Sequence, residues 1–171
     1  MTISLTGFMG SGKSSVGKEL SALLSYPVID LDSYIEEKEG RSIPEIFASG
    51  GEAAFRRMEL DALTELLSDP VQMILSLGGG TLTTPECAEL VHRKTLCIYL
   101  RAATDTLVRN LEGDTAGRPM LSQGSTSTLR GRIEELMSLR SGIYESSAHH
   151  IIDIDGKTVA AVASEIVSVI G

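Results

Sequence analysis

The residues with the clearest chemistry lie near the start of the chain, in the octet GFMGSGKS at positions 7–14. Its glycines allow the backbone to turn tightly and to direct N–H groups at phosphate oxygens. Lys13 supplies a positive charge for the terminal phosphates of a nucleotide, and the Ser14 hydroxyl can ligate Mg²⁺. The octet therefore predicts a phosphate-binding loop. We expect the phosphates of ATP to contact Gly10, Ser11, Gly12, Lys13, Ser14 and Ser15.

Two carboxylates, Asp30 and Asp32, lie where a short predicted strand at 28–31 ends. In an extended backbone, residues two positions apart project to the same side. Two carboxylates beside a phosphate-binding loop predict Mg²⁺ binding, with Asp30 as the candidate, and activation of a hydroxyl group. Asp32 could instead cap the helix that follows, and capping is compatible with substrate binding.

Helical periodicity over 52–68 gives different environments to two adjacent arginines. Phe55 and Leu63 define the apolar stripe, which also contains Glu59, whereas Arg57 falls on the opposite side. A lone buried carboxylate is costly, and Arg56, three residues earlier, is its nearest local partner. Arg56 is thus expected at the edge of the core, either as a structural ion pair or as a ligand for an anionic substrate.

A second arginine, Arg140, falls in the middle of the apolar face of a predicted helix over 128–144. A buried cation requires an anion, which either a protein carboxylate or a bound substrate must supply. Arginine suits bidentate recognition of a carboxylate. We therefore consider Arg140 a candidate substrate ligand.

The segment 112–127 is polar, rich in Gly, Ser and Thr, and longer than most connections. It predicts a mobile lid. Arg118 lies within it and is followed by Pro119, which would stiffen its presentation. A lid arginine that reaches the γ-phosphoryl group would stabilise its transfer, although a solvated loop arginine is the alternative.

The elements that must position these residues alternate between strand and helix. Alternation of this kind predicts a parallel sheet covered by helices on both faces, with ligands bound beyond the carboxyl ends of the strands. Ser42 and Glu45 form a capping box that opens a short helix ending at 50–51. We predict strands over 2–6, 28–31, 71–77, 95–100 and 150–154, and further helices over 32–39, 52–68, 86–93, 104–111, 128–144 and 157–170.

Composition narrows the possible partners. The chain has 171 residues, 42% hydrophobic and 22% charged, which fits a single globular domain. A net charge of −8 argues against a nucleic acid or an acidic membrane as partner. We find no signal peptide or membrane span, and two cysteines without metal or redox spacing suggest a reducing cytoplasm. A small soluble substrate and a monomeric protein are expected.

Several segments in this order make the chain similar to the shikimate kinase family. The resemblance covers nearly the full length and depends on GFMGSGKS at 7–14, DLD at 30–32, GEAAFRR at 51–57, LGGG at 77–80, RPML at 118–121, and the segment 140–144. It implies a P-loop kinase fold of the nucleoside monophosphate kinase type, a three-layer α/β sandwich with a five-stranded parallel sheet. The family transfers the γ-phosphoryl group of MgATP to the 3-hydroxyl of shikimate, a step of chorismate and aromatic amino acid synthesis.

The resemblance also implies roles for individual residues. It makes Lys13, Asp32 and Arg118 the catalytic residues, with Asp32 as the general base, and places Ser14 and Asp30 near one Mg²⁺. An arginine near Arg109 stacks on adenine in relatives, which makes Arg109 a further candidate for ATP binding. Shikimate would be bound within about residues 32–60 and by a set drawn from several segments. That set is Asp32, Arg56, Gly78, Gly79, Gly80 and Arg140.

Two departures and two alternatives accompany this interpretation. The family commonly has leucine where Met120 stands and proline where Gly142 stands, although neither position carries a reacting group. One alternative function is a kinase for another polyol or acid, such as gluconate. The other is a nucleotide-dependent switch without transfer chemistry, against which the absence of a guanine-recognition NKxD motif counts.

Overall fold

The computed structural model describes residues 1–112 and 128–171 of the chain. Its strands are β1 (Ile3–Thr6), β2 (Val28–Asp30), β3 (Ile74–Ser76), β4 (Leu96–Arg101) and β5 (His150–Asp153). Its helices are α1 (Lys13–Leu24), α2 (Leu31–Glu39), α3 (Ile43–Leu66), the short 3₁₀ helix η1 (Thr81–Thr83), α4 (Pro85–Lys94), α5 (Thr104–Leu111), α7 (Leu129–Ser147) and α8 (Val159–Ile170). The predicted alternation of strand and helix is confirmed.

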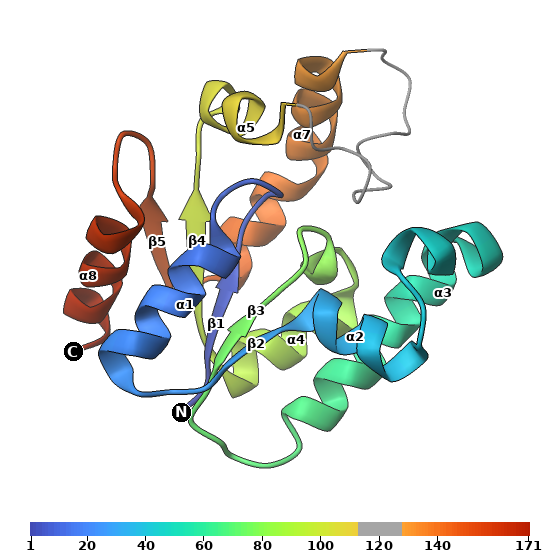
Figure 1. Ribbon diagram of the computed structural model, residues 1–171, viewed down its shortest axis with the longest axis horizontal. Helices are drawn as coiled ribbons and strands as arrows, with labels where there is room; N and C mark the ends of the chain where they lie inside the picture. Colours follow the sequence, from blue (N-terminus) through green and yellow to red (C-terminus); the bar gives the residue numbers. More distant parts are fainter. Residues whose placement is uncertain (113–127) are drawn as a thin grey trace.

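The five strands form one parallel sheet in the order β2-β3-β1-β4-β5. The central strand β1 pairs with both β3 and β4, so that Ile3 lies opposite Ile74 on one side and Leu96 on the other. Because the strands are parallel, their carboxyl ends share one edge of the sheet. The phosphate-binding loop, Asp30 and the glycines after β3 all follow strands at this edge (Figure 1).

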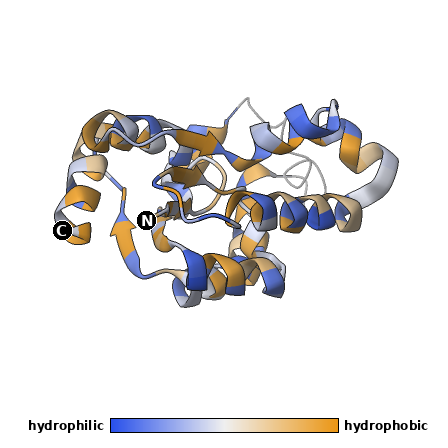
Figure 2. Cartoon of the chain, turned by 90° about the horizontal axis from the view of Figure 1, so that it is seen from below, coloured by the Kyte–Doolittle hydropathy of each residue, from blue (hydrophilic) through white to orange (hydrophobic). Residues whose placement is uncertain are grey.

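Alternating residues of the strands are buried under different helices, which makes the molecule a three-layer sandwich. Ile74 and Ile98 pack in a cluster with α1 and α8 on one face. Their neighbours Leu75 and Cys97 pack on the other face with residues of α3 and α4. Figure 2 shows blue and orange residues interspersed along the helices, as expected of amphipathic helices that cover a sheet. The predicted fold class is confirmed.

A third cluster lies under α5 and α7, beside the phosphate-binding loop. It contains Phe8 of that loop, Tyr99 of β4, and Tyr144 of α7, all at most 2% exposed. The tilted rings of Tyr99 and Tyr144 are 5.1 Å apart. This cluster attaches α7 to the sheet at the end where ligands are expected.

The start of α2 decides whether Asp32 serves as a helix cap. Asp30, not Asp32, caps this helix: its side chain accepts a hydrogen bond from the Ser33 backbone N–H at 3.0 Å. The helix begins at Leu31, one residue earlier than predicted, so Asp32 lies within the first turn. The carboxylate of Asp32 is therefore not used as a cap.

Two helices predicted on either side of 50–51 appear as the single element α3 with a break. Ser42 and Glu45 form the predicted capping box at its start. Gly51 has φ 76° and ψ −179°, which are not helical angles, so the helix axis changes direction there. A positive φ of this kind favours glycine, which explains the residue type. The strand β3 is shorter than the predicted strand over 71–77. Val71 is exposed, and the strands that pair with β3 are short, since β1 has four residues and β2 has three.

In the part of the chain that the structure describes, no helix has both the length and the apolar character needed to cross a bilayer. The predicted lid lies outside the described residues except for Glu112, and Arg118 lies outside them as well.

Candidate active site

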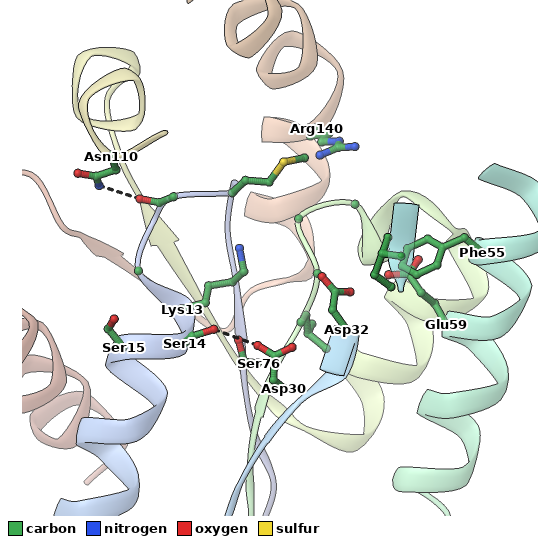
Figure 3. Close-up of a pocket in the computed structure, with 18 of the residues that line it drawn as sticks. Lys13, Ser14, Ser15, Asp30, Asp32, Phe55, Glu59, Ser76, Asn110 and Arg140 are labelled. Atoms are coloured by element: carbon green, nitrogen blue, oxygen red, sulfur yellow. Dashed lines mark hydrogen bonds between the residues drawn. The ribbon is translucent and has the colours of Figure 1, made fainter. Parts of the chain in front are cut away.

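A pocket of about 690 Å³ opens beyond the carboxyl ends of the strands (Figure 3). Its walls come from the loop between β1 and α1, the end of β2 and the start of α2, both halves of α3, the turn after β3, α5 and α7, and the start of α8. Segments far apart in the sequence thus meet at one site. All predicted site residues that the structure describes line the pocket except Ser11 and Arg109.

The phosphate-binding loop has the geometry that its sequence predicts. Gly10 and Gly12 have φ of 82° and 89°, a conformation that other residues rarely adopt. Lys13 at the start of α1 donates hydrogen bonds to the carbonyl oxygens of Gly7 at 2.7 Å and Phe8 at 3.0 Å. Ser11 is buried at 2% exposure and supports the turn from inside. The helix N-terminus and Lys13 together create a positive site for phosphate.

Ser14 and Asp30 provide two oxygen ligands side by side. The Ser14 hydroxyl donates to Oδ2 of Asp30 at 2.9 Å, and both residues line the pocket (Figure 3). Among the described residues, no group of three or more His, Cys, Asp or Glu could hold a metal ion by itself. Mg²⁺ bound to a nucleotide needs only one or two protein oxygens, because phosphates and water complete its octahedron. Ser14 and Asp30 fit this requirement.

Asp32 is a half-buried carboxylate that lines the pocket. Its Oδ1 atom is inaccessible and has no hydrogen-bond partner among the described residues. Burial raises the pKa of the Asp32 carboxyl from its usual 3.8 to about 6, and the negative charges of Glu59 and Asp30 act in the same direction against Lys13 and Arg56. A carboxylate with a pKa close to neutral can accept a proton from a substrate hydroxyl.

Arg56 is held at the edge of the core by carboxylates on its own helix, as the periodicity predicted. Its Nη1 donates to the fully buried Glu59 at 2.7 Å, and its Nη2 lies 3.1 Å from Glu52. Thr81 donates to the second oxygen of Glu59 at 2.6 Å. Arg57, the next residue, is exposed. Glu59 therefore orients Arg56 toward the pocket.

Arg140 is buried in α7, at 3% exposure, and its guanidinium lies over the Phe8 ring at 5.9 Å. Its Nη1 atom is inaccessible and has no hydrogen-bond partner among the described residues. No described carboxylate forms an ion pair with Arg140, so of the two alternatives for its anion the geometry favours a ligand in the pocket.

The turn at 78–80 touches all three charged groups. A Cβ atom at Gly78 would lie 2.9 Å from Oδ1 of Asp32, and one at Gly80 would lie 2.4 Å from Nη2 of Arg56 and 3.0 Å from Nη2 of Arg140. Gly80 has φ −109°, so the absence of a side chain is required here by contact and not by conformation. The turn therefore places its backbone directly against the part of the pocket that contains Asp32, Arg56 and Arg140.

Asn110 is one of the pocket residues that were not predicted to belong to the site. Asn110 in α5 donates to the Gly10 carbonyl oxygen at 2.8 Å and lines the pocket. The neighbouring Arg109 is exposed, lies 3.4 Å from the Thr106 hydroxyl and does not line the pocket. No sequence signal marked Asn110, because its contact joins residues 100 positions apart.

The fold and the pocket together define a P-loop kinase, in which a phosphate-binding loop faces carboxylate and arginine side chains across one cavity. A family model described as shikimate kinase matches residues 9–171, and the chain belongs to the shikimate kinase family. It is an ATP-dependent small-molecule kinase.

Individual relatives agree with the family match. Shikimate kinases of Dictyoglomus turgidum and Salinibacter ruber are 36% identical over 168 residues and 40% identical over 175 residues. These matches cover 97% and 99% of this chain and 95% and 84% of the relatives. The structure of shikimate kinase from Acinetobacter baumannii in complex with shikimate is similar at a TM-score of 0.91 and 31% identity, covering 99% of this chain and 92% of that chain.

Proposed function

We propose that the pocket transfers the γ-phosphoryl group of ATP to the 3-hydroxyl of shikimate, with Asp32 as general base and with Arg56 and Arg140 as ligands of the substrate carboxylate. One observation supports this assignment: Asp32 and Arg140 line the same pocket, and buried atoms of opposite charge on them, Oδ1 and Nη1, have no hydrogen-bond partner among the described residues. A substrate with both a hydroxyl and a carboxylate would satisfy both atoms.

The reaction then follows from the positions of these groups. Arg56 and Arg140 hold the carboxylate, which leaves the hydroxyl groups of the ring near Asp32. Asp32 takes the proton of the 3-hydroxyl while the oxygen forms its bond to the γ-phosphorus. The bond between the γ-phosphorus and the bridging oxygen breaks, and ADP leaves with that oxygen.

The nucleotide half of the pocket supplies charge and alignment. Lys13 would exchange the carbonyl oxygens of Gly7 and Phe8 for phosphate oxygens when ATP binds. Ser14 and Asp30 would hold Mg²⁺, directly or through water, and this ion neutralises phosphate charge when bound. Four further expectations stay predictions. They are the role of Arg118 as a lid residue at the transferred phosphoryl group, the contact of Arg109 with adenine, the monomeric state and the cytoplasmic location.

The assignment is tested by ADP release from MgATP with shikimate, gluconate and nucleoside monophosphates as acceptors. Among these three acceptors, we expect turnover only with shikimate. Arg140→Met should raise the KM for shikimate about tenfold to a hundredfold, because a charged hydrogen-bonding partner is lost. The exposed Arg57→Met is the matched control and should change no kinetic constant more than about twofold. Equal turnover of gluconate, or an unchanged KM for shikimate in Arg140→Met, would refute the proposal.

A further inference from the structure

Tyr144 is a buried polar residue in α7 that the reaction just described does not use. It is 1% exposed and lies one helical turn after Arg140, so both side chains leave the same face of the helix. Its ring packs against Tyr99 at 5.1 Å between centroids. Its hydroxyl donates a hydrogen bond to the carbonyl oxygen of Gly79, which lies 65 residues away in the chain.

The Tyr144 hydroxyl also interacts with the Arg140 guanidinium. Burial raises the pKa of Tyr144 to about 12, and the positive charge and hydrogen bonding of Arg140 oppose this increase. The hydrogen bond of the Tyr144 hydroxyl therefore holds Gly79 at a point where the backbone lies beside the Arg140 guanidinium.

Arg140 and the glycine turn are already in close contact. A Cβ atom at Gly79 would lie 3.5 Å from Nη1 of Arg140, and one at Gly80 would lie 3.0 Å from its Nη2. Phe8 of the phosphate-binding loop borders the same guanidinium at 5.9 Å. A small rotation of Arg140 would therefore either collide with the turn or withdraw the guanidinium from the pocket.

We propose that Tyr144 is a positioning residue for shikimate binding, whose hydroxyl holds the Gly79 backbone against Arg140 and thereby fixes the guanidinium that binds the carboxylate. This inference rests on the proposed role of Arg140. Tyr144 does not reach the reacting atoms; it acts through Arg140 and the turn. Its loss should weaken the binding of shikimate and leave the binding of ATP unchanged.

The test is Tyr144→Phe, which keeps the ring and its packing and removes only the hydroxyl. We expect the KM for shikimate to rise roughly tenfold, the effect of one lost hydrogen bond on a charged ligand-binding group, with the KM for MgATP and kcat within about twofold. The control is Tyr99→Phe, because Tyr99 belongs to the same aromatic pair and is equally buried, but lies on β4 and not one helical turn from Arg140. It should leave both KM values unchanged.

A double-mutant cycle separates this proposal from the proposed function. If Tyr144 acts through Arg140, adding Tyr144→Phe to Arg140→Met should raise the KM for shikimate by less than about twofold beyond the single Arg140→Met variant. An unchanged KM for shikimate in Tyr144→Phe, equal increases for both substrates, or full additivity with Arg140→Met would overturn the positioning role. An unchanged KM in Arg140→Met would instead refute the proposed function itself.

Discussion

Replacement of Asp32 by asparagine should make the protein inactive and, at neutral pH, more stable. The substitution keeps the size of the side chain and removes its negative charge. In the folded protein this charge is buried, and Oδ1 has no hydrogen-bond partner among the described residues. The same property that makes Asp32 a suitable base therefore destabilises the unliganded fold.

The magnitude follows from the pKa of this carboxyl, which burial raises from 3.8 to about 6. One pKa unit corresponds to about 1.4 kcal/mol, so the ionised carboxylate reduces the free energy of unfolding by about 3 kcal/mol. The folded state binds the proton more tightly than the unfolded state. The reduction in the free energy of unfolding is therefore absent below about pH 3.8, grows as the pH rises toward about 6, and is complete above that value.

The measurement is urea unfolding of the wild-type protein and Asp32→Asn, without ligands, at several pH values. Linkage predicts that the variant exceeds the wild-type protein in free energy of unfolding by about 3 kcal/mol at pH 7.5 and by only about 1 kcal/mol at pH 4.5. Other titrating groups contribute equally to both proteins and cancel in this difference. Asp61→Asn removes an exposed carboxylate from α3 and serves as control, with a difference below about 0.5 kcal/mol at both pH values.

The outcome that would refute this reasoning is a stability difference that does not change between pH 4.5 and 7.5, or a variant that is less stable than the wild-type protein at pH 7.5. Either result would mean that the Asp32 carboxylate is solvated or paired in the folded protein. Phosphoryl transfer should be abolished in the same variant while ATP binding persists, because the phosphate-binding loop is untouched. Loss of ATP binding would contradict the role assigned to Asp32.

Two further predictions concern the same pocket. The kcat/KM for shikimate should fall tenfold per pH unit below about pH 6, where Asp32 becomes protonated, and a pH profile whose acidic limb lies near pH 4 would contradict this. Gly80→Ala should raise the KM for shikimate more than about tenfold, because the new methyl group displaces the guanidinium groups of Arg56 and Arg140. Its control is Gly142→Ala in α7, where a Cβ atom meets nothing within 4 Å, and a KM increase of equal size in both variants would argue against a contact effect.

Local patterns in the sequence predicted much of this structure. The capping box of Ser42 and Glu45, the break near Gly51 and the buried pair of Arg56 and Glu59 depend on residues within a few positions of each other, so periodicity and residue type suffice. The burial of Arg140 followed from helical spacing in the same way. These features are determined by local geometry.

The contacts that complete the site could not be predicted in this way. Thr81 with Glu59, Asn110 with Gly10, and Tyr144 with Gly79 join residues 22, 100 and 65 positions apart. They depend on the strand order β2-β3-β1-β4-β5, which no local pattern specifies. The predicted start of α2 was one residue too late, because a helix boundary inferred from a local pattern varies by one or two residues.

The two unpartnered atoms of the pocket explain how one site can be selective for an acceptor with two different polar groups. Each buried polar atom without a partner costs about 1–3 kcal/mol in the free protein. A ligand recovers this energy only if it brings a hydroxyl to Asp32 and an anion to Arg140 at once, because the turn at 78–80 fixes the distance between them. An acceptor that lacks either group leaves one atom buried and unpaired. If Asp32 and Arg140 have the proposed roles, selectivity in this pocket would arise from buried atoms that have no hydrogen-bond partner among the described residues.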